Sequence, residues 1–252
     1  MSLGNIIIKR RFIGPPNSAN GGYACGRIAA FIDGSAEVTL RRPPPIDQEM
    51  TVREASDGSV AMYDGETLIG SGESISFASV LIEAPTFEQA SKAAQRTFDA
   101  SLHTLPTCFV CGPQRAPGDG LRIHVGPIDP QDEQWQGVLA APWVPGENVA
   151  DEEGFVLPEF VWAALDCPTA YACSSPAGMR HILLGRQSVE ILRRPGAAER
   201  CIIAAQETSH DGRKSYAAAT LFGEEGAAIA FCKATWIEVA PHVHKGALKQ
   251  AG

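Results

Sequence analysis

Hydrophobic residues recur at helical spacing in two stretches of this chain, and each stretch precedes a series of strand patterns. The first stretch, residues 22–32, follows a loop rich in Pro, Asn and Gly and predicts a short helix. The second, residues 158–172, is apolar on nearly every face, so it predicts a buried helix that begins at Pro158. Pro168 lies inside this second stretch and is expected to break or kink the helix.

Residues with the two-residue alternation of strands follow both predicted helices. They cover 38–42, 50–56, 59–63 and 67–81 in the first half, and 188–193, 201–208, 214–222 and 228–239 in the second, with one more strand near 136–140. Tight turns such as Asp57-Gly58 and Asp211-Gly212 separate neighbouring strands. Each half therefore contains one helix followed by four strands.

A third helical pattern, which starts at Pro85, lies between the two halves and predicts a linking helix. We therefore expect a first unit over residues 1–84, a linker over 85–104, a second unit over 105–242 and a C-terminal tail over 243–252. His242 and His244 are expected to be solvated near this tail, because Pro241 ends the last strand.

The two halves also share a short sequence. Leu40-Arg41-Arg42-Pro43 recurs as Leu192-Arg193-Arg194-Pro195, in each case on the first strand after the helix. Four identical residues are weak evidence alone, but the order of helix and strands matches as well. We interpret the chain as a tandem duplication of one α+β unit.

Charge and composition exclude several classes of protein. With 21 Lys and Arg against 29 Asp and Glu, the formal net charge is -8, which disfavours general binding to nucleic acid or to an anionic membrane. No apolar run approaches the roughly 20 residues that a membrane span needs, so we expect a cytoplasmic protein. Its 7 cysteines are an odd number, and we expect reduced thiols rather than a disulfide framework.

Two glycine-containing segments resemble motifs of a known family. Cys108-Phe109-Val110-Cys111-Gly112-Pro113, continuing to Gly120-Leu121-Arg122-Ile123, resembles the entry segment of hotdog-fold acyl-CoA thioesterases of the phenylacetate-pathway type. Asn20-Gly21-Gly22 resembles the His-Gly-Gly motif that opens their central helix, with Asn in place of His. The resemblance implies a double hotdog: two tandem units, each an antiparallel sheet wrapped around a central helix.

The same resemblance implies one composite site between the two units. In the family, Gly amides at one helix start hold the thioester carbonyl, and an acid on the partner helix handles water or attacks. Residue by residue, the first half keeps the glycines but has Ala29 at the acid position. The second half has Leu157-Pro158-Glu159 in place of the motif and keeps Asp166. One site would then join Asn20, Gly21 and Gly22 to Asp166.

This set of residues suits thioester chemistry. Unpaired amides at a helix N-terminus stabilise the negative charge that a carbonyl oxygen acquires during attack. Asp166 could serve as a general base for water or as a nucleophile, and Asn20 could orient water or the carbonyl. The structural alternatives are that Asp166 caps backbone amides at a break before Pro168, and that Asn20 and the glycines only cap a helix.

Four arginines and one glutamate are weaker candidates for substrate binding. Arg41, Arg42, Arg193 and Arg194 could contact the phosphates of coenzyme A, although ordinary solvent-facing strand charge is the favoured explanation. Glu159 could line the second, decayed site or could only favour the helix dipole.

Cys108 and Cys111 have metal-like spacing, and His103 and His124 are nearby in the sequence. A closed structural zinc site needs four ligands, usually in recognisable pairs, and only one tight pair is present. We therefore expect neither a metal nor an organic cofactor.

The expected function is hydrolysis of an acyl thioester, carried by coenzyme A or by a carrier protein. A hydratase or dehydratase of enoyl thioesters is disfavoured, because neither predicted helix contains a His. A protein that binds acyl thioesters or another small ligand without turnover remains the third alternative. Two units in one chain already form the paired arrangement, so the sequence leaves a monomer or a homo-oligomer open.

Overall fold

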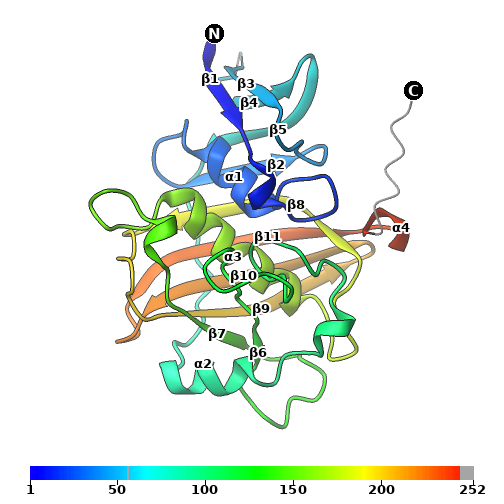
Figure 1. Cartoon of the computed structure of the whole chain (residues 1–252), viewed down its shortest axis with the longest axis vertical. Helices are drawn as coiled ribbons and strands as arrows, with labels where there is room; N and C mark the ends of the chain where they lie inside the picture. The colour runs from blue at the N-terminus through cyan, green and yellow to red at the C-terminus, as the bar shows by residue number, and fades with distance from the viewer. Residues whose placement is uncertain (56, 245–252) are drawn as a thin grey trace.

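The strands of the protein form one antiparallel sheet that continues through both halves of the chain (Figure 1). This computed structural model describes residues 1–55 and 57–244. Within those residues the sheet has eleven strands in the order β1-β3-β4-β5-β2-β8-β11-β10-β9-β7-β6. The expected tail, residues 243–252, lies outside the described residues except for its first two positions.

The first unit consists of β1 (Ser2–Ile7), α1 (Gly21–Ala29), β2 (Ala36–Leu40), β3 (Glu49–Glu54), β4 (Val60–Asp64) and β5 (Thr67–Ser74), with a 3-10 turn at Arg10–Phe12. The second consists of β6 (Gly126–Pro127), β7 (Leu139–Trp143), α3 (Pro158–Ala172), β8 (Ile182–Ile191), β9 (Cys201–Asp211), β10 (Lys214–Gly223), β11 (Ala228–Glu238) and α4 (Pro241–His244). Between the two units along the chain comes α2 (Phe87–Ala94), and 3-10 turns occur at Ala100–Leu102 and Glu147–Val149.

The duplication is visible in the strand order. The first unit runs β1-β3-β4-β5-β2 and the second runs β7-β9-β10-β11-β8, which is the same order when the strands of each unit are matched along the chain. The units join where β2 pairs with its counterpart β8. Ala36 pairs with Val189, and Glu37 pairs with Ser188. When the repeats are aligned at Leu40 and Leu192, Ala36 corresponds to Ser188 and Glu37 corresponds to Val189. The two pairs are therefore equivalent under the repeat. The repeat in sequence is therefore also a repeat in space.

The two central helices pack directly against each other. Gly22 of α1 faces Asp166 and the carbonyl of Trp162, and a Cβ atom at Gly22 would lie 2.8 Å from that carbonyl oxygen. Gly26, one turn later, faces Glu159, whose Cα would lie 2.6 Å from an added Cβ. The absence of side chains on this face of α1 lets the backbones approach closely.

The sheet is covered on both faces in the second unit. Alternate residues of β7 and β9 point to opposite faces, as strand geometry requires. Leu139 and Ile203 belong to the main core with α1 and α3, whereas Ala140 and Ile202 pack with Ala90 of α2. The linking helix thus lies on the face opposite the central helices.

Several predicted boundaries were wrong. The helix α3 continues through Pro168 to Ala172, and every residue from Phe160 to Ala172 is buried. A proline removes one helical hydrogen bond, and burial of the surrounding helix on all sides compensates for that loss. The strands β1 and β6 were not predicted, β5 ends at Ser74, and β8 begins at Ile182.

The described residues contain no helix that is both long and apolar enough to cross a bilayer.

Candidate functional site

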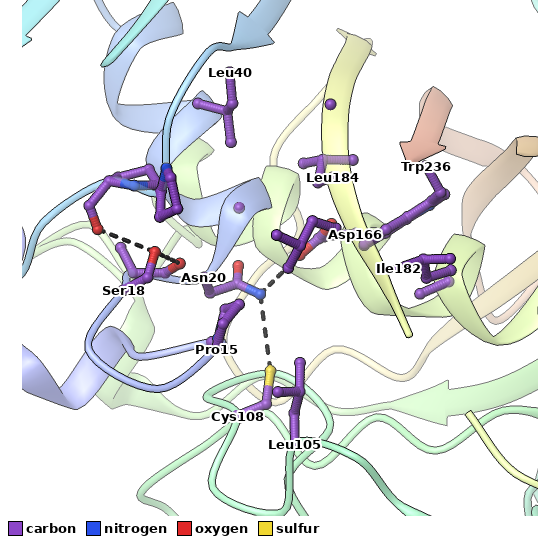
Figure 2. Close-up of a pocket in the computed structure, with 18 of the residues that line it drawn as sticks. Pro15, Ser18, Asn20, Leu40, Leu105, Cys108, Asp166, Ile182, Leu184 and Trp236 are labelled. Carbon is purple, nitrogen blue, oxygen red and sulfur yellow. Dashed lines mark hydrogen bonds between the residues drawn. The ribbon is translucent and has the colours of Figure 1, made fainter. Parts of the chain in front are cut away.

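A cavity of about 240 Å³ lies where the two units meet (Figure 2). Its walls come from the start of α1, the loop after β2, the Cys108 loop, the middle of α3 and the strands β8 and β11. Most of the lining side chains are apolar, including Leu40, Met179, Ile182, Leu184 and Trp236. Such a lining suits an acyl chain better than a polar group.

Asn20 begins α1 and faces this cavity. Its Oδ1 accepts a hydrogen bond of 2.9 Å from the Tyr23 N–H, which is the usual role of an N-cap residue. Its Nδ2 donates to Asp166 Oδ2 over 2.7 Å. The capping bond therefore fixes the amide in the orientation that holds the carboxylate.

Asp166 lies in the middle of α3 and is only 2% exposed. Its Oδ1 is also buried and has no hydrogen-bond partner of normal geometry within the described part of the chain. Burial raises the pKa of Asp166 to about 7, and the nearby Cys108 sulfur raises this pKa further, while the Gly22 N–H and the Asn20 amide oppose the shift. The expected alternative, that Asp166 caps a break in its own helix, is wrong because α3 is continuous there.

The two motif glycines occupy different environments. Gly21 lines the cavity, and an added Cβ would lie 2.9 Å from Leu184 Cβ. Gly22 is buried against Asp166 instead. As the first two helical residues of α1, both have N–H groups without a carbonyl one turn earlier in the helix. The structure thus brings together Asn20, Gly21, Gly22 and Asp166.

Two of the four candidate arginines border the cavity. Arg41 and Arg42 line it and are exposed, and neither forms an ion pair with another described residue. They follow β2 directly, so the end of that strand presents their charges at the rim.

The remaining candidates for substrate binding are placed elsewhere. Arg193 binds both carboxylate oxygens of Glu199, at 3.1 and 2.7 Å, and Arg194 is paired with Asp151. Glu159 lies 4.0 Å from Arg27 and packs against Gly26. None of these three lines the cavity, so we drop Arg193, Arg194 and Glu159 as substrate ligands.

The counterpart of this site, at the start of α3, lacks the same groups. Leu157 is the N-cap of α3 and makes no side-chain capping bond, and Pro158 has no N–H. The acid position is Ala29, the last residue of α1. Asn20 and Leu157 are aligned in the sequence, and in the structure each is the N-cap of its helix.

Three thiols line the cavity together with Asp166. Cys108 and Cys111 come from the loop that the sequence singled out, and Cys167 follows Asp166 on α3. Cys167 was not predicted from the sequence, although its position next to Asp166 on a buried helix was the available signal. Hydrogen bonds from the Cys111 and Cys167 thiols hold the pKa of Cys108 well below its usual value, while burial raises the pKa of Cys111 and Cys167.

Burial favours the neutral form of the two histidines near this loop. Burial lowers the pKa of His103 to about 4 and also lowers that of His124. His124 Nε2 lies 3.0 Å from the Cys111 carbonyl oxygen, and His103 Nδ1 accepts the Leu105 N–H at 3.0 Å. Both rings therefore support the loop.

Comparison with known proteins places this geometry within a fold. No family model matches the sequence, and no curated protein matches it either. Among solved structures, the TesB protein of Mycobacterium avium subsp. paratuberculosis has a TM-score of 0.60 at 14% identity, with 89% of each chain covered. A hotdog-fold protein of unknown function from Alicyclobacillus acidocaldarius has a TM-score of 0.58 at 11% identity, covering 94% of this chain and 93% of its own.

This chain has the double-hotdog fold. A structure named acyl-CoA thioesterase II, from Mycobacterium marinum, has a TM-score of 0.54 at 12% identity and covers 94% of this chain and 93% of its own. At such low identities, the structural likeness establishes only the arrangement of the two hotdog units. The reaction has to be argued from the residues of the composite site.

Proposed function

We propose that the protein hydrolyses acyl thioesters at the cavity between its two hotdog units. The observation that carries this proposal is the 2.7 Å hydrogen bond from Asn20 Nδ2 to Asp166 Oδ2 at the cavity wall. It joins the start of one central helix to Asp166, the only acidic side chain among the described residues that line the cavity. Several structural neighbours are named thioesterases, which supports the same reaction class.

The polar groups have complementary tasks in this reaction. Asp166 takes a proton from the attacking water, or attacks the carbonyl carbon itself to form an acyl anhydride that water then hydrolyses to the free acid. The Gly21 N–H at the start of α1 donates to the carbonyl oxygen as it becomes negative, and one such donor contributes about 3 kcal/mol in comparable sites. The apolar wall holds the acyl group, and the thiol of the carrier leaves with the proton from Asp166 or from solvent.

The cationic rim favours coenzyme A as the carrier. Arg41 and Arg42 are free of ion pairs within the described chain and stand at the cavity edge. Guanidinium groups form paired hydrogen bonds with phosphate oxygens. They give this acidic protein a local site for an anionic substrate.

The test is hydrolysis of short, long and aromatic acyl-CoAs by the wild type and by Asp166→Asn, followed by chromatography. This substitution keeps the size of the side chain and removes its base, so we expect kcat/KM to fall at least about 100-fold. Circular dichroism and the unfolding temperature establish that the variant is folded. Equal turnover by a folded Asp166→Asn protein would contradict the proposed role of this carboxylate.

One observation favours a second function, binding without turnover. Asp166 is 2% exposed and already bonded to Asn20, so water has little access to its carboxylate in this conformation. A wild type that hydrolyses no member of the panel, yet binds an acyl-CoA with a saturable calorimetric signal, would favour this function over hydrolysis.

A further inference from the structure

The sulfur atoms of three cysteines converge at one wall of the cavity. Cys108 and Cys111 lie in the loop before β6, and Cys167 lies on α3. Their three Sγ atoms are all within 4.8 Å of one another, and Cys108 Sγ lies 3.7 Å from Cys167 Sγ. Among the described residues, this is the one group of potential metal ligands of three or more members.

The spacing of these sulfurs matches that of a thiolate metal site. Two sulfurs bound tetrahedrally to zinc at about 2.3 Å are separated by about 3.8 Å. The Cys108–Cys167 separation agrees with this value. The third sulfur needs only a small approach to complete the same triangle.

The loop is shaped to point both of its thiols in one direction. Gly112 N–H donates to the Cys108 carbonyl over 2.9 Å, which closes a tight turn from Cys108 to Gly112. A Cβ at Gly112 would lie 2.5 Å from that carbonyl oxygen and 2.6 Å from the Cys108 nitrogen. Glycine is therefore required where the turn brings Cys108 and Cys111 together.

Polar groups of the composite site lie next to these sulfurs. Asp166 precedes Cys167 on α3 and is buried, and its Oδ1 accepts no hydrogen bond of normal geometry from the described residues, although the nearby Gly22 N–H lowers the pKa of this carboxyl. Asn20 Nδ2 lies 3.8 Å from Cys108 Sγ and 3.9 Å from Cys167 Sγ, so an amide donor also faces the sulfurs. Such a donor stabilises bound thiolates from outside the ligand set.

We propose that Cys108, Cys111 and Cys167 bind one thiophilic divalent cation, zinc by its chemistry, with the fourth position turned toward the cavity and Asp166. Thiolate ligands select zinc over magnesium or calcium. Binding releases the thiol protons to solvent and fastens the Cys108 loop to α3. The expectation of no metal came from the single Cys pair in the sequence, and the third ligand is 59 residues away on a helix. This site does not depend on the proposed hydrolysis.

The first test is the metal content of the full-length wild type, purified without a metal-affinity tag or chelator. We expect close to one zinc ion per chain by elemental mass spectrometry. Cobalt(II) added to the reduced, metal-depleted protein should give a thiolate-to-cobalt charge-transfer band and the visible bands of tetrahedral cobalt. Neither readout uses hydrolysis, so failure of the metal site and failure of the enzyme proposal are distinguishable.

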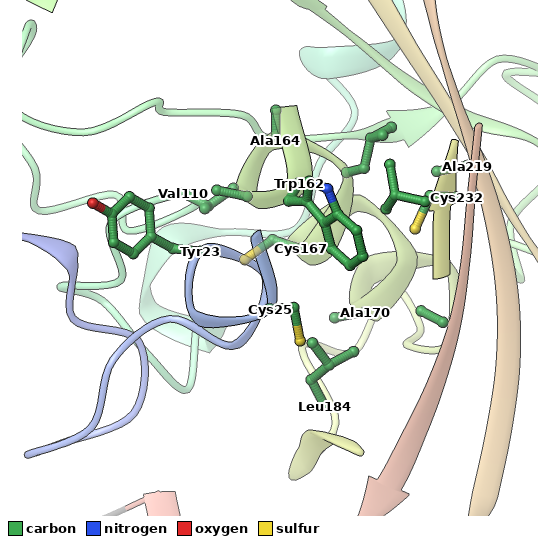
Figure 3. Close-up of a cluster of buried hydrophobic side chains, with 14 of the residues drawn as sticks. Tyr23, Cys25, Val110, Trp162, Ala164, Cys167, Ala170, Leu184, Ala219 and Cys232 are labelled. Atoms are coloured by element: carbon green, nitrogen blue, oxygen red, sulfur yellow. The ribbon is translucent and has the colours of Figure 1, made fainter. Parts of the chain in front are cut away.

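Variants locate the ion. Cys108→Ser, Cys111→Ser and Cys167→Ser should each reduce the zinc content and the cobalt band. The matched controls are Cys25→Ser and Cys232→Ser, because these thiols are also buried but lie outside the group of three (Figure 3). Where a ligand variant fails to fold, the wild-type results decide. A metal-free wild type without a cobalt charge-transfer band, or a Cys108–Cys167 disulfide in the purified protein, would overturn the proposal.

Discussion

The two helix starts of this duplicated fold are equivalent in position and opposite in chemistry. α1 begins with Asn20, whose amide caps the helix and holds Asp166, whereas α3 begins with Leu157, which makes no capping bond. The position of the acid on the partner helix is occupied by Asp166 in one case and by Ala29 in the other. The same backbone thus supports one polar composite site and one without its polar groups, so in a duplicated fold the site has to be identified by side chains.

The arginine repeats differ in the same way. Arg41 and Arg42 form no ion pair with another described residue at the cavity rim, whereas Arg193 and Arg194 are paired with Glu199 and Asp151. An identical four-residue sequence therefore places free cations at the rim of the cavity in one unit and forms internal ion pairs in the other. The difference arises from Glu199 and Asp151, the acidic residues that lie beside the copy in the second unit.

The largest effect on this comparison should come from Asn20→Asp. Aspartate caps a helix as well as asparagine does, so the Tyr23 N–H keeps its acceptor. The substitution removes the donor to Asp166 and brings a second buried carboxylate against it, so the two would share a proton. We expect hydrolysis to fall about 100-fold or more, measured as kcat by chromatography.

The matched control for Asn20→Asp is Leu157→Asn, which installs the missing cap at the other helix start. Leu157→Asn should leave hydrolysis unchanged, since Leu157 does not line the cavity. A similar loss in both variants would mean that the two helix starts are not functionally different, and the composite site would then be wrong.

The next largest effect should be on stability, from Gly22→Ala. The added methyl group would collide with Asp166 Cβ and would lie 2.8 Å from the Trp162 carbonyl oxygen, so the two helices have to separate. Overpacking of this kind costs about 1–3 kcal/mol, and the better helix propensity of alanine returns at most about 1 kcal/mol. We expect the free energy of unfolding in urea to fall by about 1–2 kcal/mol.

The control for Gly22→Ala is the equivalent position in the other helix, Glu159→Ala. Glu159 has an ion pair of 4.0 Å with Arg27 and partial exposure, so its removal should cost less than about 1 kcal/mol. If Gly22→Ala proved as stable as the wild type, the close approach of α1 to α3 would not be needed to position Asp166.

The sequence predicted the fold better than it predicted the site. Helical spacing, alternating strands and the repeated Leu-Arg-Arg-Pro predicted two tandem α+β units, and the resemblance of the Asn20 and Cys108 segments predicted that these are hotdog units. The pairing of Asn20 with Asp166 came from the family resemblance, because no local pattern links residues 146 positions apart. Cys167 shows the limit: its role depends on a loop far away in the sequence.

Strand β1 and the path of α3 through Pro168 were missed for a related reason. The edge strand β1 follows from its pairing with β3, not from its own alternation, because its residues Ser2, Leu3 and Asn5 are exposed. A proline breaks an isolated helix, but tertiary burial of Phe160 to Ala172 outweighs one lost hydrogen bond. Local propensity cannot supply either of these long-range contributions.

The smallest effect should come from the arginine repeats. The double variant Arg41→Ala, Arg42→Ala removes both guanidinium groups and should raise KM for an acyl-CoA about tenfold, which corresponds to about 1.4 kcal/mol. The effect is small because solvent screens the attraction between exposed charges and phosphate. The value of kcat should stay the same, since neither arginine contacts the reacting carbonyl in the proposed site. A thioester of N-acetylcysteamine, which has no phosphates, should show no change, and the effect on acyl-CoA should weaken at high salt. Arg193→Ala is the control: it breaks the ion pair with Glu199 and should lower stability slightly without changing KM. An increase in KM from Arg193→Ala equal to that from the double variant would mean that the free and the paired repeats serve the substrate alike.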